Sequence, residues 1–296
     1  MSSVAIRAMP VVFVLIWSTG FVVARLAMPH APPFGFLAMR FALSAACFAL
    51  WMRFAGVAWP RDRRQLGHLA VTGVLMQAVY LGGVWAAVRN GLGAGTVALV
   101  VGLQPVLTAV WLSGRGDGAG GDAVVGTRWL GLALGFLGLG LVVWNKLGVG
   151  EMTLLNLAFG IAALIGITVG TLYQKRFVQP CDVRAASGVQ MLAALTIALP
   201  VALLEPGLID WRHPDFAIAM AWSVLVLTLG GSSLLYLLIQ RGETTSVTSL
   251  LYLVPPCTAA MAWALFGEPV TLLMVAGMIA IAFGVALVMR TPRSLG

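Results

Sequence analysis

Polar side chains recur at helical spacing inside long apolar segments of this chain. The stripes are Gln77 and Tyr80; Thr228, Ser232 and Tyr236; and Thr245, Thr248, Ser249 and Tyr252. Residues three, four or seven positions apart share one face of a helix. Hydroxyls and amides can orient a solute by hydrogen bonds, and aromatic rings can stack on its apolar body. The stripes therefore predict a binding site for a neutral or zwitterionic small molecule.

Other side chains extend this predicted site. Trp17 lies at the middle of the first apolar segment, Gln104 precedes Pro105, and Arg40 is the one charge deep inside an apolar segment. Arg40 could capture a carboxylate or pair with carbonyls at a helix end, and Ser or Thr could bond to their own helix. The predicted substrate-binding residues are Trp17, Arg40, Gln77, Tyr80, Gln104, Ser232, Ser249 and Tyr252.

The residues needed for catalysis or metal binding do not form a recognisable pattern. The three histidines lie in or beside separate connections, and neither H-E-x-x-H nor G-x-S-x-G occurs. The three cysteines are far apart and fit no metal or redox spacing. None of the ten acidic residues lies at the middle of an apolar segment, which disfavours proton-coupled export of cations. The sequence predicts no enzyme, no metal site and no cofactor.

The elements that must position the stripes are membrane-spanning helices. Hydrophobic residues make up 60% of the 296 and charged residues 9%, whereas soluble domains carry about a quarter charged residues. A span needs roughly 20 apolar residues, and the segments lack the alternation of barrel strands. We predict an all-α polytopic membrane protein with ten transmembrane helices, near 8–27, 34–52, 67–88, 94–112, 128–145, 153–173, 184–204, 217–239, 244–266 and 270–289.

The net charge of +8 follows the loops of this topology. Ten spans place both termini on one side, where the connections and ends carry 13 Lys and Arg against 4 on the other side. The positive-inside rule then puts both termini in the cytoplasm, which predicts a multi-pass protein of the cell (inner) membrane. Because no basic patch with interleaved aromatic residues occurs, we expect no nucleic-acid partner. The expected partners are the lipid bilayer and a small-molecule substrate.

The chain also matches itself at an offset of 150 residues. The matched pairs are Gly20 and Gly170, Arg25 and Lys175, Arg40 and Gln190, Pro105 and Pro255, Thr108 and Thr258, and Ala109 and Ala259. A shortening of the second half by four residues then brings Gly131 and Gly138 onto Gly277 and Gly284. We predict two five-helix repeats, 1–148 and 149–296. An odd number of spans gives them opposite topology, and inverted repeats are typical of secondary transporters with a site between the halves.

Several motifs resemble those of a known family. They are Ile16-Trp17-Ser18-Thr19-Gly20-Phe21-Val22-Val23-Ala24-Arg25, Leu37-Ala38-Met39-Arg40-Phe41, and Leu265-Phe266-Gly267-Glu268-Pro269. In this order they resemble the two-repeat EamA branch of the drug/metabolite transporter superfamily, over essentially the whole chain. The resemblance implies export of amino acids or related metabolites, with the aromatic amino-acid exporters of the YddG type as the nearest comparison. The first repeat lacks the Gly-Glu element, so we expect Glu268 to cap a helix or pack a loop.

Prolines interrupt equivalent helices of the two halves. Proline removes a backbone donor and clashes with the preceding turn, so Pro105 and the pair Pro255-Pro256 should bend the fourth and ninth spans. Matched interruptions predict a hinge for alternating access, and static kinks are the alternative. The motifs Gly91xxxGly95, Gly131xxxGly135 and Gly166xxxGly170 allow close helix packing, within a monomer or across a homodimer.

Three other functions compete with amino-acid export. A carrier of sugar phosphates or nucleotide sugars, from the same superfamily, should place several Lys or Arg at mid-span, and only Arg40 qualifies. A polytopic membrane enzyme should show a nucleophile, paired carboxylates or clustered histidines near a membrane face. An ion channel should show a filter or a charged ring, and neither is recognisable.

Overall fold

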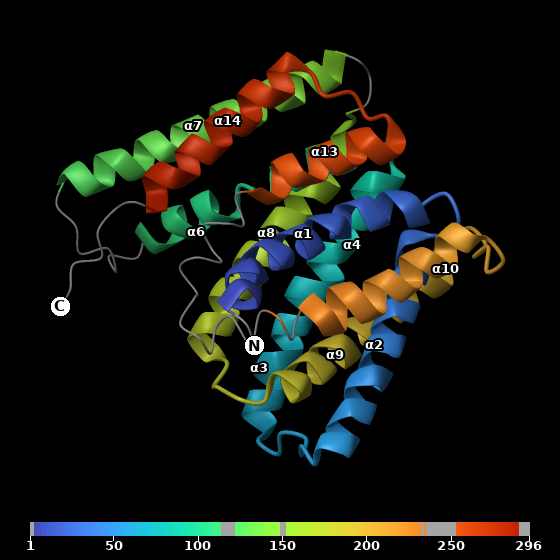
Figure 1. Ribbon diagram of the computed structural model, residues 1–296. Coiled ribbons are helices and arrows are strands. Elements are labelled where there is room, and N and C mark those ends of the chain that lie inside the picture. The colour runs from blue at the N-terminus through green and yellow to red at the C-terminus, as the bar shows by residue number, and fades with distance from the viewer. Residues whose placement is uncertain (1–2, 114–121, 149–151, 232–233, 235–252, 290–296) are drawn as a thin grey trace.

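A computed structural model describes residues 3–113, 122–148, 152–231, 234 and 253–289 (Figure 1). All regular structure in these residues is helical, which confirms the predicted fold class. The helices in chain order are α1 (Ser3–Ala27), α2 (Pro33–Ala55), α3 (Arg63–Gly73), η1 (Val74–Val79), α4 (Tyr80–Arg89), α5 (Ala94–Val101), α6 (Gln104–Ser113), α7 (Asp122–Gly148), α8 (Leu154–Phe177), α9 (Val183–Leu204), α10 (Pro214–Ala221), η2 (Trp222–Gly230), α13 (Val254–Phe266) and α14 (Leu272–Met289).

These elements account for the ten predicted spans. Four continuous helical stretches are long and apolar enough to cross a membrane: Pro33–Ala55, Arg63–Arg89, Leu154–Phe177 and Val183–Leu204. Six shorter apolar helices supply the others: Val11–Ala27, Ala94–Thr108, Trp129–Val142, Pro214–Gly230, Val254–Phe266 and Leu272–Gly284. The third, fourth and eighth spans are each built from more than one helical segment.

Local capping fixes several helix ends. Asp62 and Asp182 begin α3 and α9 by accepting hydrogen bonds from the backbone two residues on. Thr153 and Asn156 form a reciprocal capping box at the start of α8. The helices α2 and α13 end at Gly56 and Gly267, whose φ angles of 67° and 66° suit glycine. These caps set where each span stops.

The two halves of the chain pack against each other through equivalent helices. The second span α2 packs on the seventh, α9, and α5 of the fourth span packs on α13 of the ninth. The third span packs on the sixth, α8, and the first span, α1, packs on the eighth. Each of these two pairs is converted into the other when the two halves are exchanged. This reciprocity is what two inverted repeats require.

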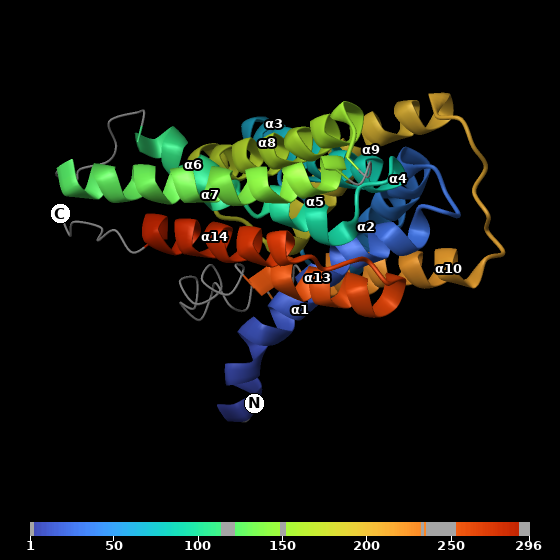
Figure 2. The ribbon, with the colours of Figure 1, turned by 90° about the horizontal axis from the view of Figure 1, so that it is seen from above.

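The fifth and tenth spans form a tight pair along one edge of the bundle, side by side in both views (Figures 1 and 2). A Cβ added at Gly138 would lie 2.6 Å from the Gly277 carbonyl oxygen, and one at Gly284 would lie 2.4 Å from that of Gly131. The four glycines matched between the halves therefore meet one another directly. Glycine permits this backbone contact because any side chain would hold the helices apart.

Candidate functional site

Two π-helical segments occur at equivalent places in the halves. The segment η1 (74–79) interrupts the third span, and η2 (222–230) interrupts the eighth, close to the 150-residue offset. Gln77 lies half-buried in η1, and Thr228 lies buried in η2. The Thr228 hydroxyl donates to the Ser223 carbonyl five residues back, at 2.8 Å. Such segments are frequent at functional sites, because they turn side chains out of the regular helical register.

Arg40, Tyr80 and Thr228 form a polar cluster where three helices meet. Arg40 on α2 is 7% exposed, and its Nε and Nη2 donate to the Thr228 hydroxyl at 3.4 and 3.3 Å. Tyr80 at the start of α4 is also buried and lies close enough to interact electrostatically with Arg40. The structure thus brings together two of the predicted site residues and adds Thr228, a member of one predicted stripe.

Among the described residues, the guanidinium of Arg40 has few hydrogen-bond partners for a buried charge. It carries five N–H donors, and both of its hydrogen bonds to described residues are long and go to one hydroxyl. No carboxylate of the described chain lies within salt-bridge distance of it. A carboxylate could accept two parallel hydrogen bonds from this side chain. The cluster can therefore bind an anionic group.

The fourth span breaks immediately before its proline. The helix α5 ends at Val101, and Pro105 is the second residue of α6, so the break lies at Gly102–Leu103. Pro255 is likewise the second residue of α13. A proline fits the first turn of a helix, where its missing N–H needs no partner, so the fourth span breaks before Pro105 and does not bend at it.

The two proline sites touch. A Cβ at Gly102 would lie 3.1 Å from the Cγ atom of Pro255, which shows how closely the break in α5–α6 packs on α13. Ser18 and Thr258 join α1 to α13 as well, since the Thr258 hydroxyl donates to the Ser18 carbonyl at 3.2 Å. The break in the fourth span and Pro255 therefore lie together between the halves. Their role as a hinge stays a prediction.

Two other predicted site residues, Gln104 and Trp17, contact residues outside the Arg40 cluster. Gln104 at the start of α6 donates from Nε2 to the Thr171 hydroxyl on α8 at 3.1 Å, a contact between the halves. Trp17 is half-buried on α1, with its ring 5.5 Å from that of Phe13. Gln104 and Trp17 are thus held by other partners than the Arg40 cluster. Ser232, Ser249 and Tyr252 lie outside the described residues.

One end of the bundle is closed by carboxylates of the second half. We call it the clasped end; the connections 28–32, 90–93, 205–213 and 267–271 meet there. Glu268 accepts from the backbone of Ala94 at 3.0 Å and Gly95 at 3.5 Å, which caps α5. Glu205 accepts from Phe34 at 2.8 Å and Gly35 at 3.3 Å, which caps α2. The expectation that Glu268 caps a helix agrees with these contacts. The sequence did not predict the cap that Glu205 forms on α2.

Two histidines that are distant in sequence also meet at the clasped end. The rings of His30 and His213 stack with centroids 3.6 Å apart, beside Asp215. The prediction of no metal site depends partly on the separation of the histidines along the chain. His30 and His213 nevertheless lie close together in space. A sequence signal was absent because the two connections belong to different halves.

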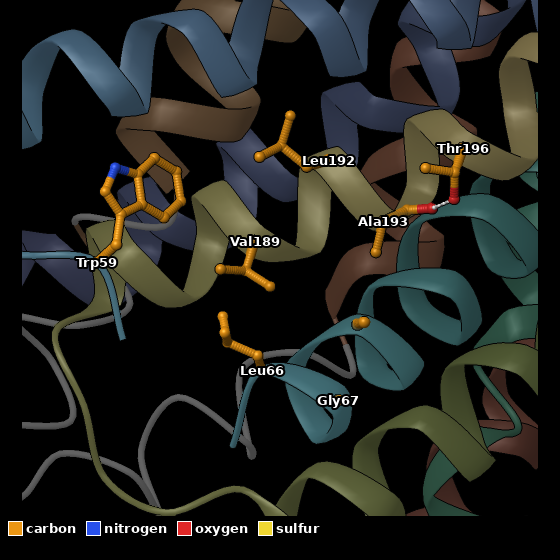
Figure 3. A pocket seen from close by; sticks show the side chains of 8 residues that line it. Trp59, Leu66, Gly67, Val189, Leu192, Ala193 and Thr196 are labelled. Atoms are coloured by element: carbon orange, nitrogen blue, oxygen red, sulfur yellow. Dashed lines mark hydrogen bonds between the residues drawn. The ribbon is translucent and has the colours of Figure 1, made fainter. Parts of the chain in front are cut away.

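An apolar groove of about 470 Å³ lies away from the polar cluster, between α3 and α9 (Figure 3). Trp59 and Leu192 line it and are 41% and 45% exposed. Its one polar side chain, Thr196, donates to the Ala193 carbonyl of its own helix. A shallow groove with this lining suits the lipid-facing perimeter of a membrane protein, so it does not extend the polar site.

Ten apolar spans among the described residues, in two inverted repeats with paired π-helical segments and a polar cluster between them, are typical of a polytopic membrane transporter. The comparisons with known proteins agree. The sequence profile of the EamA-like transporter family matches residues 8–144 and again residues 154–290. The chain therefore belongs to the EamA-like transporter family.

Relatives in this family include proteins from two bacterial groups. The chain is 24% identical to "Uncharacterized transporter YvbV" of Bacillus subtilis (strain 168), over 93% of this chain and 88% of that one. It is also 24% identical to "Probable amino-acid metabolite efflux pump" of Escherichia coli (strain K12), over 92% and 90% of the two chains. A solved crystal structure shares the fold with a TM-score of 0.65 at 18% identity, over 97% of this chain and 96% of that chain.

Proposed function

We propose that this transporter exports neutral amino acids or related small metabolites across the cell (inner) membrane by alternating access. The observation that carries the proposal is the buried Arg40 guanidinium, which has two long hydrogen bonds to Thr228 and lies close to Tyr80. A substrate carboxylate would complete its hydrogen bonding, and neighbouring rings would accommodate an apolar side chain. Two relatives, each named "Probable amino-acid metabolite efflux pump", support this substrate class.

The proposed route runs from the cytoplasmic side to the clasped end. The bias of 13 Lys and Arg to 4 supports cytoplasmic termini, and the clasped end would then face away from the cytoplasm. Export would require release of the Glu205 and Glu268 caps, together with movement at the break before Pro105 and at Pro255. Inverted repeats exchange conformations in this way.

A sugar-phosphate carrier is the alternative within the superfamily. A phosphate carries more charge than a carboxylate and is usually held by several cations. Arg40 is the one buried charged side chain of the described chain. This single cation favours a carboxylate over a phosphate.

The test is efflux from liposomes that contain the purified protein and are loaded with labelled phenylalanine or with phenylalaninamide, which lacks the carboxylate. We expect the wild type to export the amino acid at least about tenfold faster than the amide, because charged hydrogen bonds contribute about 1.5–3 kcal/mol. The substitution Arg40→Gln should abolish this discrimination. Arg53→Gln, on the exposed last turn of the same helix, is the matched control.

Three outcomes would contradict the proposal. Equal efflux of the acid and the amide by the wild type would show that the carboxylate is not recognised. Unchanged discrimination in Arg40→Gln would show that recognition lies elsewhere. Export of a sugar phosphate in place of any amino acid would favour the alternative carrier.

A further inference from the structure

The histidines at the clasped end form a compact donor set with one carboxylate. His30 Nε2 lies 3.7 Å from Asp215 Oδ2, and His213 Nδ1 lies 3.8 Å from the same oxygen. One donor atom from each of the three residues lies within 4.8 Å of the others. Their side chains are 17%, 39% and 41% exposed for His30, His213 and Asp215, so an ion could reach them from water.

The backbone around the three residues is held in place. Pro29, Pro32 and Pro33 flank His30, and Pro214 separates His213 from Asp215. Proline fixes φ and so limits the conformations of both connections. A hydrogen bond of 2.8 Å from the Asp210 N–H to the His30 carbonyl then joins the two connections. The donor atoms are thus brought together by structure that does not depend on a bound ion.

Ordinary structural roles use little of this donor set. His213 caps α10 by accepting the Asp215 N–H at Nδ1, a long contact of 3.3 Å, and a metal ion bound to this nitrogen would replace it. The His30 ring makes no hydrogen bond to another described residue beyond its ion-pair contact with Asp215. Two stacked imidazoles beside a carboxylate therefore offer at least two nitrogens and an oxygen to a ligand.

We propose that His30, His213 and Asp215 bind a divalent zinc ion. Zn²⁺ takes imidazole nitrogen and carboxylate oxygen at about 2.0–2.2 Å, which puts tetrahedral donors about 3.3 Å apart. The two nitrogens lie 3.7 and 3.8 Å from the Asp215 oxygen, and all three donor atoms lie within 4.8 Å of one another, so they need to approach by up to about 1.5 Å, within the reach of side-chain torsions. Both rings must turn out of their stack so that the nitrogens converge. A water molecule would complete a fourth position.

The bound ion would join the two halves of the transporter. His30 belongs to the connection between α1 and α2, and His213 and Asp215 belong to the start of α10. A metal bridge there would reinforce the Glu205 and Glu268 caps and hold the clasped end closed. This consequence rests on the proposed export function, since it requires that end to open during transport.

The binding test uses the full chain, purified with an affinity tag that contains no histidine, with its free cysteines alkylated. Isothermal titration with Zn²⁺ should show one saturable site. Loss of even an outer-shell group costs metal sites roughly 10–100-fold in affinity, so His30→Ala and Asp215→Asn should each weaken binding at least about tenfold. The chain has three histidines, and His68→Ala at the opposite end is the matched control that should bind as the wild type does.

A second measurement separates this site from the proposed export. Efflux by the wild type and by His68→Ala should slow when Zn²⁺ is added, and efflux by His30→Ala should not. An absence of binding by the wild type, or equal binding by His30→Ala, would overturn the site. Zn²⁺ binding with undiminished efflux would overturn only the bridging consequence. If no tested substrate is exported by any variant, the proposed export fails while the titration still decides the site.

Discussion

Replacing Gly284 with alanine should push α7 and α14 apart. The new Cβ would lie 2.4 Å from the Gly131 carbonyl oxygen and 2.9 Å from the Gly135 nitrogen, both backbone atoms that no rotamer change can move. Ordinary van der Waals contact begins at 3.4 Å, so the helices must separate by about 1 Å. The pair loses dispersion contact along its length, because the whole seam depends on close backbone approach.

The size of the effect follows from two opposing contributions. Overpacking of a tight interface costs about 1–3 kcal/mol. Alanine is the better helix former by about 1 kcal/mol, so Gly284→Ala should destabilise the fold by a net of up to about 2 kcal/mol. Gly140 lies on the same pair with nothing within 4 Å of its added Cβ. Gly140→Ala should therefore stabilise the protein by about 1 kcal/mol, and the two substitutions should differ in sign.

The assay is equilibrium unfolding of each variant in mixed micelles with increasing SDS, followed by circular dichroism. Gly138→Ala should behave as Gly284→Ala does, since its Cβ would lie 2.6 Å from the Gly277 carbonyl oxygen. The double variant Gly138→Ala and Gly284→Ala should lose less stability than the sum of the two single losses, because one separation of the helices relieves both clashes. If Gly284→Ala is as stable as Gly140→Ala, the close packing of this seam is refuted.

Three further predictions concern the clasped end, the prolines and the topology. Glu268→Ala should lower the free energy of unfolding by about 1 kcal/mol, because the α5 cap is lost. Glu268→Gln should keep most of the wild-type stability, because the ion pair with the 42% exposed Arg25 contributes little. Thermal denaturation checks this, and an equal loss of stability in the two variants would favour the ion pair. Replacing Pro255 and Pro256 together by alanine should slow efflux from liposomes without loss of folded protein. Pro200 inside α9 has no counterpart in the first half, so Pro200→Ala should leave the efflux rate unchanged. Efflux at the wild-type rate by the double variant would show that these prolines only fix the shape of the helix. Reporter fusions after Arg290 and within the 205–215 connection should report opposite sides of the membrane, and the same side for both would contradict ten spans.

The number and order of the spans could be predicted because the bilayer imposes them. Each span must be about 20 apolar residues long, and this constraint is visible in composition alone. The repeat was also visible, since Gly131, Gly138, Gly277 and Gly284 occupy matched positions and are in contact across the α7–α14 seam. Such contacts leave a sequence signal because only glycine fits them.

The details that depend on packing between the halves could not be predicted. An interruption such as η2 replaces one hydrogen-bond register by another, and neighbouring helices decide which is favoured. Pro105 indicated where the fourth span is interrupted, but the break lies two to three residues earlier, at Gly102–Leu103. His30 and His213 meet only because two connections from different halves are fixed side by side. No local pattern encodes such a meeting.

The distribution of hydrogen-bond partners between the end and the middle of the bundle supports a route for substrate. At the clasped end, Glu205 and Glu268 each accept two backbone N–H groups that would otherwise lack helical partners. In the middle, Arg40 holds a buried charge with one hydroxyl as its hydrogen-bond partner among the described residues. A carboxylate that reaches Arg40 gains a charged hydrogen bond and relieves a desolvated cation, whereas one that reaches the clasped end must displace caps already in place. Under the proposed export, binding energy would be available at the middle, and the end would act as the barrier that the conformational change must open.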